Sequence, residues 1–295
     1  MRRAWWPGAT TTVAGIVGTP VSHSLSPLLH NAAFGAAGLD WVYVAFPVPE
    51  GERDGWVGAA RCLGVRGLSV TMPHKQAAAR LADVRSATAG RLGAANTLYW
   101  EGDRLAAEST DGEGFLASLA DEGVELGGRR VVVLGAGGAA KAVALAVASA
   151  GAAWIGVVAR RESAAVQVAA MAGDPVTVAT RDDVRAADVV VNATPVGMAG
   201  GPAPDASPVE EGLLEVAQVV VDLVYRPLRT PLLALAEQTG AKAVDGTGML
   251  LHQAAAQFEL WTGVEAPVGA MREALQAHLA LEVAGEQTLG THGVR

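Results

Sequence analysis

Lys75 stands at a point of the sequence where its ammonium group could carry chemistry. It lies in the stretch LSVTMPHKQAAA, whose first half predicts a strand and whose proline and alanines predict the first turns of a helix. Open α/β sheets bind their ligands beyond the carboxyl ends of strands, so a lysine at this junction can face a cleft. The stretch alone leaves open the alternative that Lys75 is a solvated surface residue.

Other polar side chains follow predicted strands in the first third of the chain. They belong to the stretches SHSLSP, SVT, ANT and STD, which begin at residues 22, 69, 95 and 109. Each stretch also has an ordinary explanation, since Ser26 can be the N-cap of a helix and Asp111 can cap the helix that follows it. Hydroxyls, an amide, a lysine and a carboxylate gathered at strand ends would together suit a small polyhydroxy acid.

A glycine-rich turn, GAGGAA at residues 135–140, predicts a dinucleotide site. It follows the apolar strand VVVL and opens an alanine-rich helix, which is the context that the motif requires. Gly135 permits the tight turn, Gly137 lets the backbone approach a pyrophosphate, and the small Ala140 lets helix and strand pack closely. The helix N-terminus offers N–H groups to the phosphates, and a purely structural turn is the alternative. The predicted cofactor contacts here are Gly135, Ala136, Gly137, Gly138 and Ala139.

Two arginines after the next strand favour NADP over NAD. An NAD site usually has an acidic side chain there for the ribose hydroxyls, whereas this chain has Arg160 and Arg161, which suit a ribose phosphate. A solvated arginine pair is the alternative, and Glu162 lies close by in the sequence. The stretch NATPVGM ends a later strand at the same sheet edge, where an ordinary turn is again the alternative. Its predicted cofactor contacts are Asn192, Ala193, Thr194 and Met198.

The elements that must position these residues form two sets. The first set mixes short strands, helices and a hairpin turn, which predicts a mixed α/β substrate domain over residues 1–110. The second set alternates apolar strands with helices, which is typical of a doubly wound parallel sheet, and predicts a Rossmann-type domain over residues 111–245. Two last helices, within residues 246–295, are expected to return to the first domain. The expected strands are residues 13–17, 41–46, 68–71, 96–100, 104–108, 131–134, 154–158, 176–179, 188–192 and 219–224.

Composition narrows the class of protein. The chain has 295 residues, of which 51% are hydrophobic, and its net charge of −8 argues against nucleic acid or an anionic membrane surface as the main partner. No apolar run reaches membrane-spanning length. Cys62 is the one cysteine, which excludes an intrachain disulfide and a thiolate metal cluster, so we expect a cytoplasmic protein without a metal. The six histidines show no metal-ligand spacing, and His30 is expected to be packed or capping.

Eight ordered motifs of the chain resemble those of the shikimate dehydrogenase family, over residues 13–281. They are GTPVSHSLSPLLHNAAF, GLSVTMPHK, GAANTLYW, STDGEGF, VVVLGAGGAAKA, NATPVGM, DLVYRPLRTPLL and DGTGMLLHQAAAQFELWTG. The resemblance implies an NADP-dependent oxidoreductase that reversibly reduces 3-dehydroshikimate to shikimate, a step of the chorismate pathway to aromatic amino acids. It implies shikimate as the small-molecule partner, and we expect a monomer or a homodimer.

The resemblance also implies a role for each matching residue. Lys75 matches the catalytic lysine and Asp111 its hydrogen-bonding partner, and whether Lys75 or the pair titrates as the acid–base group stays open. Ser24 and Ser26 match the serines that bind the substrate carboxylate, and Tyr225 is expected near it. The other implied substrate ligands are Ser69, Thr71, Asn96 and Gln253, in addition to Lys75 and Asp111, and the other implied cofactor contacts are Gly246 and Met249.

Three positions depart from the family pattern. Ser69 stands where the family often has asparagine, so its substrate contact is expected to be weaker or mediated by water. Ser109 replaces the usual asparagine of N-T-D-G, and ARR at residues 159–161 replaces the usual N-R-T, which leaves the NADP preference standing. The competing interpretations are a quinate or aminoshikimate-type dehydrogenase of the same family and a catalytically silent NADP-binding regulatory protein. Retention of both Lys75 and Asp111 argues against the silent protein.

Overall fold

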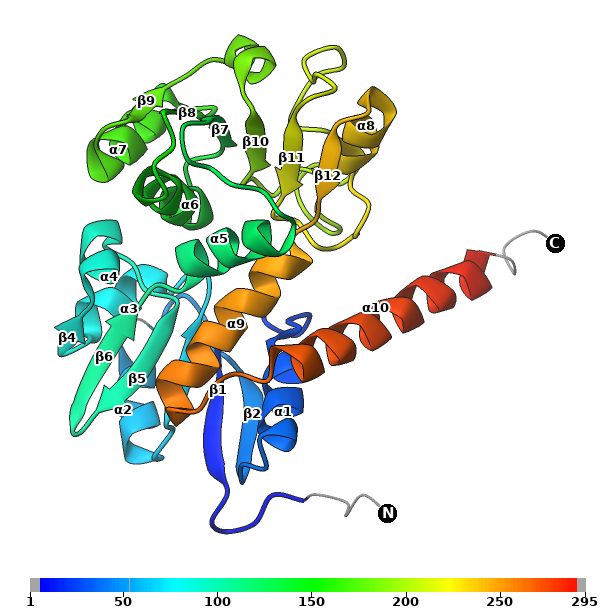
Figure 1. The fold of residues 1–295 in the computed structure, drawn as a ribbon. Coiled ribbons are helices and arrows are strands. Elements are labelled where there is room, and N and C mark those ends of the chain that lie inside the picture. The colour runs from blue at the N-terminus through cyan, green and yellow to red at the C-terminus, as the bar shows by residue number, and fades with distance from the viewer. Residues whose placement is uncertain (1–5, 53, 291–295) are drawn as a thin grey trace. The chain divides into compact units, whose positions relative to one another are not determined.

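The computed structural model describes residues 6–52 and 54–290 and consists of two compact units (Figure 1). Unit 1 comprises Met1–Ser86, Ala95–Glu108 and Ala254–Arg295, and unit 2 comprises Ala87–Ala94 and Ser109–Gln253. Compared with the expected boundaries, unit 2 also takes in residues 87–94, 109–110 and 246–253. Within the described ranges, no helix has both the length and the apolar character needed to traverse a bilayer.

Unit 1 contains a mixed six-stranded sheet in the order β2-β1-β3-β5-β6-β4. β1 pairs in parallel with β2 and β3, whereas β5 runs antiparallel to both β3 and β6. The parallel trio brings the carboxyl ends of its strands to one edge, and this edge carries the polar loops. The strands are β1 (Thr12–Gly18), β2 (Trp41–Pro47), β3 (Gly67–Val70), β4 (Val84–Arg85), β5 (Thr97–Glu101) and β6 (Arg104–Glu108).

α10 (Val268–Gly290) and the second part of α9 (Thr247–Thr262) belong to unit 1. α10 packs against α1 (Ser26–Ala36), and the Trp261 ring of α9 covers Gly67 of β3. A Cβ on Gly67 would lie 2.5 Å from that ring, so only glycine lets the helix approach the strand this closely. The remaining helices of this unit are α2 (Gly55–Cys62) and α3 (Lys75–Leu81).

The start of α1 differs in one detail from the expectation. Pro27 lies in the first turn, as its fixed backbone angle favours, but Leu25 is the N-cap and Ser26 makes no side-chain cap. The predicted cap by Ser26 is therefore wrong. Ser24 Oγ instead accepts a hydrogen bond from the Ser26 backbone N–H at 3.2 Å, so the earlier serine supports this loop.

Unit 2 contains a six-stranded sheet, all parallel, in the order β12-β11-β10-β7-β8-β9. Numbered from its own first strand, this is the order 6-5-4-1-2-3 of a Rossmann fold, with the switch point between β7 and β10. Both the two-domain α/β class and the Rossmann-type second domain were predicted from the sequence and are confirmed. The strands are β7 (Arg130–Leu134), β8 (Trp154–Val158), β9 (Val176–Val178), β10 (Val189–Asn192), β11 (Val219–Asp222) and β12 (Lys242–Val244).

The apolar strands of unit 2 are buried on both faces. Val131, Val132 and Val133 of β7 have no exposed surface, and Val132 belongs to a different core cluster from its two neighbours. Because alternate residues point to opposite faces, helices must cover both sides of the sheet. The helical segments of this unit are α4 (Ala87–Leu92), α5 (Asp111–Asp121), α6 (Gly138–Ser149), α7 (Glu162–Ala172), η1 (Arg181–Ala186), α8 (Pro231–Thr239) and the first part of α9.

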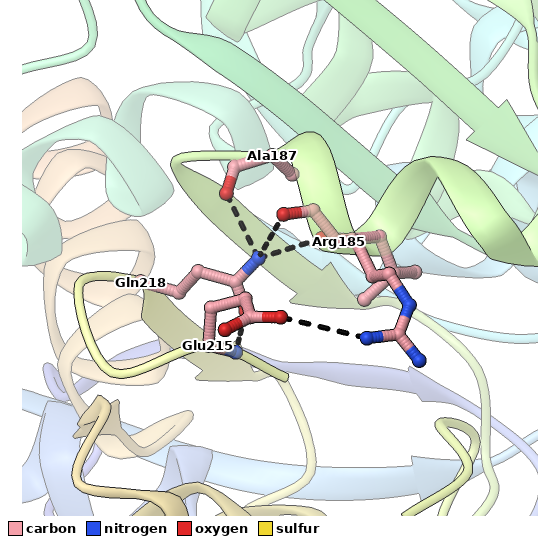
Figure 2. A network of polar contacts seen from close by, with 5 residues as sticks. Arg185, Ala187, Glu215 and Gln218 are labelled. Carbon is pink, nitrogen blue, oxygen red and sulfur yellow. Dashed lines mark hydrogen bonds and ion pairs between the residues drawn. The ribbon is translucent and has the colours of Figure 1, made fainter. Parts of the chain in front are cut away.

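A polar network fixes the amino ends of β10 and β11, the edge of the sheet opposite the glycine turn. Figure 2 shows the amide of Gln218 directed at carbonyl oxygens of the segment that ends η1, and its Nε2 donates to the Ala187 carbonyl at 2.9 Å. Its Oε1 accepts from the Glu215 N–H at 2.9 Å, and Glu215 forms an ion pair with Arg185 at 3.5 Å. Gln218 is 3% exposed, so its amide replaces the water that these backbone groups would otherwise bind.

Candidate active site

Backbone hydrogen bonds bring the polar loops of unit 1 together at the ends of β1 and β3. The Thr71 N–H donates to the Val17 carbonyl at 2.9 Å, and the Thr19 N–H donates to the Met72 carbonyl at 3.0 Å. A Cβ on Gly18 would lie 2.3 Å from Thr71 Cγ2, so glycine is needed where these two loops touch. The loop that carries Ser24 and Ser26 therefore leaves the sheet beside Thr71.

Backbone hydrogen bonds also hold Lys75 and Asn96 near the carboxyl end of β3. The Ala95 N–H donates to the Lys75 carbonyl at 2.8 Å, and the Val70 N–H donates to the Asn96 carbonyl at 2.7 Å. Lys75 is half-buried as the first residue of α3, and Asn96 is 3% exposed. Asn96 Oδ1 accepts from Thr97 Oγ1 at 2.8 Å, and this bond orients the amide. Unit 1 thus brings together the segments that carry Thr71, Lys75 and Asn96.

Ser69 differs from its neighbours, because its hydroxyl is engaged inside the protein. The residue is 5% exposed, and its Oγ accepts from the Tyr43 hydroxyl and donates to Gln257 Oε1, both at 2.6 Å. Neither partner was named as a site residue from the sequence. The sequence gives no local signal for Gln257, which is separated from Ser69 by 188 positions.

Asp111 and Gln253 lie close together in unit 2, on α5 and α9. Asp111 is 8% exposed and is the first residue of α5, where a carboxylate is favoured by the helix dipole. The preceding Thr110 donates its hydroxyl to the Gln253 carbonyl at 3.1 Å. A Cβ on Gly114 would lie 2.6 Å from the Gln253 nitrogen, so this glycine sets how closely the two helices pack.

The glycine turn occupies the switch point of the Rossmann sheet. Gly135 follows β7 with φ +116°, and a Cβ there would lie 2.9 Å from the Ala193 carbonyl oxygen after β10. Gly137 is the N-cap of α6, and a Cβ on Gly137 or Gly138 would meet no atom of the protein within 4 Å. The exposed backbone of these two glycines can approach a pyrophosphate at the helix N-terminus, so the turn fits a dinucleotide.

A buried carboxylate, Asp222, holds the loops beside this turn. It is fully buried and accepts hydrogen bonds from Asn192 Nδ2 at 2.8 Å, the Val224 N–H at 3.0 Å and Thr230 Oγ1 at 2.6 Å. Burial raises the pKa of the Asp222 carboxyl, and these donors partly oppose the shift. Asn192 in turn accepts from the Thr194 N–H at 3.0 Å. The network ties the loop after β10 to the loop after β11.

Sequence reasoning missed Asp222, although one signal was present. A lone acidic residue ends the apolar run VVVD, where burial is expected on both sides. Asn192 was predicted to contact the cofactor, but its amide is engaged with Asp222, Thr194 and the Val196 carbonyl. The Asn192 side chain therefore shapes the loop that carries Ala193 and Thr194, and its contact with the cofactor stays a prediction.

The other predicted contacts of unit 2 lie at ends of its strands. Arg160 and Arg161 are exposed directly after β8, the neighbour of β7. Tyr225 is half-buried after β11, and burial raises the pKa of its hydroxyl. Gly246 packs on the Leu223 carbonyl, and Met249 packs against the core of unit 2, whereas Met198 is 36% exposed. The residues described contain no cluster of histidine, cysteine and acidic side chains that could hold a metal ion.

Comparison with known proteins decides the family. The description "Shikimate dehydrogenase substrate binding domain" matches residues 16–98, and "Shikimate 5'-dehydrogenase C-terminal domain" matches residues 246–276. The shikimate dehydrogenase (NADP(+)) of Moorella thermoacetica is 42% identical over 287 residues, which cover 94% of this chain and 97% of that protein. The chain belongs to the shikimate dehydrogenase family.

Solved structures of the family have the same fold. The shikimate 5-dehydrogenase of Thermus thermophilus in complex with NADP(H) and shikimate is 37% identical, with a TM-score of 0.84 over 90% of this chain and 99% of that one. A quinate dehydrogenase from Corynebacterium glutamicum in complex with NAD is 32% identical, with a TM-score of 0.83 over 90% of this chain and 99% of that one. The resemblance inferred from the eight motifs is confirmed.

The residues expected to act in this family divide between the two units. Unit 1 carries six of the predicted substrate residues, and unit 2 carries the rest together with every predicted cofactor contact. The pairing of Lys75 with Asp111 joins residues of different units, and it stays a prediction. The unit 1 residues are Ser24, Ser26, Ser69, Thr71, Lys75 and Asn96, and the unit 2 substrate residues are Asp111, Tyr225 and Gln253.

Proposed function

We propose that this chain catalyses the reversible, NADP-dependent reduction of 3-dehydroshikimate to shikimate. The observation that carries the proposal is the fastening of Thr71, Lys75 and Asn96 at one edge of the unit 1 sheet, within the residues that match the family's substrate-binding domain. A Rossmann sheet with a glycine turn at its switch point supplies the second requirement, a dinucleotide site. Membership of the family supports the combination of the two.

The reaction adds a hydride to the carbonyl carbon and a proton to its oxygen. The hydride would come from NADPH when it is bound, and the protein orients the ketone and supplies the proton. Lys75 donates that proton, because an ammonium beside the oxygen stabilises the negative charge that develops in the transition state. Asp111 orients the ammonium group by a hydrogen bond. In the direction of alcohol oxidation the lysine takes the proton back.

The other residues hold the substrate. Ser24 and Ser26 bind the carboxylate, near Tyr225, and hydrogen bonds from Thr71, Asn96 and Gln253 to the ring hydroxyls fix which carbon faces the nicotinamide. Gly246 and Met249 belong to the nicotinamide side of the cofactor site, and Arg160 and Arg161 bind the ribose phosphate.

Steady-state kinetics of Lys75→Ala test the mechanism. We expect turnover with shikimate and NADP⁺ to fall at least about 10²-fold, the usual effect of removing a general acid–base group, while the KM for NADP⁺ changes little. Lys242→Ala is the matched control, because Lys242 pairs with Glu122 on the surface of unit 2. Near-normal turnover of Lys75→Ala would overturn the assignment.

A quinate or aminoshikimate-type dehydrogenase is the second candidate, supported by the similarity to the quinate dehydrogenase structure. Assays that cross shikimate and quinate with NADP⁺ and NAD⁺ discriminate between the candidates, and the arginine pair after β8 predicts NADP⁺ in either case. Absence of turnover with every acid, together with binding of NADPH, would favour a silent NADP-binding protein instead.

We further propose a cytoplasmic enzyme that works as a monomer or homodimer. The free and exposed Cys62 suits a reducing compartment. Cell fractionation and analytical ultracentrifugation test the two statements separately.

A further inference from the structure

A chain of buried hydrogen bonds runs behind the substrate residues of unit 1. The Tyr43 hydroxyl donates to Ser69 Oγ at 2.6 Å, Ser69 Oγ donates to Gln257 Oε1 at 2.6 Å, and Gln257 Nε2 donates to the Asn96 carbonyl at 3.3 Å. Tyr43, Ser69 and Gln257 are 2%, 5% and 1% exposed, and they come from β2, β3 and α9. These three residues are called the Tyr43 chain below.

The direction of the Tyr43 chain follows from its proton inventory. If the Gln257 amide were turned over, its oxygen would face the Asn96 carbonyl oxygen, and two acceptors would meet without a proton between them. The amide nitrogen must therefore face Asn96, and the amide oxygen must accept from Ser69. Ser69 has only one proton, so its second bond must be accepted from Tyr43. Each of the three hydrogen bonds then contains one proton, which fixes the direction of the chain.

The Tyr43 chain contains one residue predicted to bind substrate, Ser69, and it ends on a second, Asn96. Burial raises the pKa of the Tyr43 hydroxyl, and the hydrogen bond to Ser69 partly opposes this shift. The backbone carbonyl of Asn96 accepts from both Gln257 and Val70. Ser69 and Asn96 are both buried, at 5% and 3% exposed.

Aromatic packing holds the Tyr43 ring in place. The His30 ring stacks on it with centroids 4.4 Å apart and an angle of 19° between the planes, and the Trp261 ring lies 5.9 Å away. Rings packed in this way leave the phenol one position, so the donor end of the chain is preorganised.

We propose that Tyr43 and Gln257 are positioning residues for the substrate, which hold the Ser69 hydroxyl and the backbone of Asn96 in register. The inference rests on the proposed function. Tyr43 touches no reacting atom in this account and acts only through its hydrogen bond. Ser69 retains a lone pair but no proton for a ligand, so it can accept a hydrogen bond from substrate and cannot donate one.

Tyr43→Phe is the variant that tests the proposal, because it removes only the hydroxyl. We expect the KM for shikimate to rise about 5- to 10-fold, the worth of one buried hydrogen bond, with the KM for NADP⁺ within about 2-fold of wild type. Tyr99→Phe is the matched control, since its hydroxyl bonds to Glu101 at 3.2 Å on the hairpin. Ser69→Ala and the double variant Tyr43→Phe/Ser69→Ala complete a double-mutant cycle. Ser69→Thr keeps a hydroxyl, so its shikimate KM should lie closer to wild type than that of Ser69→Ala.

The outcomes separate this inference from the proposed function. The inference is supported if Tyr43→Phe raises the shikimate KM in the wild-type background but not in the Ser69→Ala background, because such non-additive effects show that the chain acts as a unit. Additive effects, or an unchanged shikimate KM in Tyr43→Phe, overturn the inference while the enzyme remains a shikimate dehydrogenase. A fall in thermal stability with equal changes in both KM values shows a merely structural role and also overturns it. If the wild type neither oxidises shikimate nor binds it in calorimetry, the proposed function fails, and the inference fails with it.

Discussion

Alanine substitutions at Gly135 and Gly137 should separate the two jobs of the glycine turn. In Gly135→Ala the new Cβ would lie 2.9 Å from the Ala193 carbonyl oxygen and 3.2 Å from Thr194 Cγ2, at a φ of +116°. Such a backbone angle costs a non-glycine residue about 1–3 kcal/mol, and overpacking costs about another 1–3 kcal/mol. We therefore expect a loss of about 2–6 kcal/mol and a fall in Tm of roughly 4–24 °C.

Gly137→Ala should behave in the opposite way. Gly137 has φ −78° and ψ −172°, an extended conformation open to any residue, and a Cβ there meets nothing within 4 Å. Its Tm should stay within about 2 °C of wild type, because neither strain nor overpacking arises. If a pyrophosphate approaches this backbone, the methyl group stands in its way, and the KM for NADP⁺ should rise at least about 10-fold.

Scanning calorimetry gives the two Tm values, and initial rates at saturating shikimate give the KM for NADP⁺. The reasoning is refuted in either of two ways. A Gly135→Ala protein as stable as wild type would show that the Ala193 carbonyl can move aside without lowering the free energy of unfolding. A Gly137→Ala protein with wild-type affinity for NADP⁺ would show that the pyrophosphate does not bind at this turn.

Three further predictions follow from charged and buried groups. Replacing Arg160 and Arg161 together by alanine should raise the KM for NADP⁺ roughly 10- to 100-fold and leave that for NAD⁺ nearly unchanged, and equal effects on both cofactors in initial-rate assays would contradict a ribose-phosphate site. Burial lowers the pKa of His30 to about 3, so below its ordinary pKa of 6.5 the imidazole is protonated in the unfolded chain but not in the folded one, and the unfolding free energy decreases as the pH is lowered. Urea titrations at pH 7.5 and 5 should show a smaller decrease for His30→Leu than for wild type. Burial raises the pKa of Asp222, so the folded state keeps that proton to a higher pH than the unfolded state does, and the stability gained from it in acid is lost as the pH rises through the raised pKa. The difference in unfolding free energy between wild type and Asp222→Asn should therefore shrink from pH 4 to pH 7. A difference that grows instead would show that the hydrogen bonds to Asp222 outweigh its burial.

The Rossmann unit could be read from the sequence because its signals are local. Valine runs such as VVVL and VVVN are buried on both faces, and glycine turns and alanine helices follow them at short range. Two of the short strands, β4 and β12, gave no such signal. β4 and β12 are too short to show a period, and their pairing with β6 and β11 decides that they are strands.

Only those residues of the candidate site that directly follow strands could be predicted from the sequence. Polar residues after β1 and β3 are brought together by the sheet itself, so their types and positions in the sequence suffice. The partners of Ser69 and Asn192 are different, because Gln257 and Asp222 reach them across 188 and 30 positions. Tertiary packing alone chooses such pairs, and no periodicity in the chain encodes them.

The hydroxyl of Ser69 limits how this protein can distinguish its substrates. An asparagine side chain offers both a donor and an acceptor, whereas Ser69 donates its one hydrogen bond to Gln257 Oε1 and accepts one from the Tyr43 hydroxyl. Any direct recognition at position 69 must then use a hydroxyl of the substrate as donor, and a ring carbonyl gains nothing there. In the proposed mechanism, selection between ketone and alcohol would then fall to Lys75, and selection among ring hydroxyls would fall to Thr71, Asn96 and Gln253.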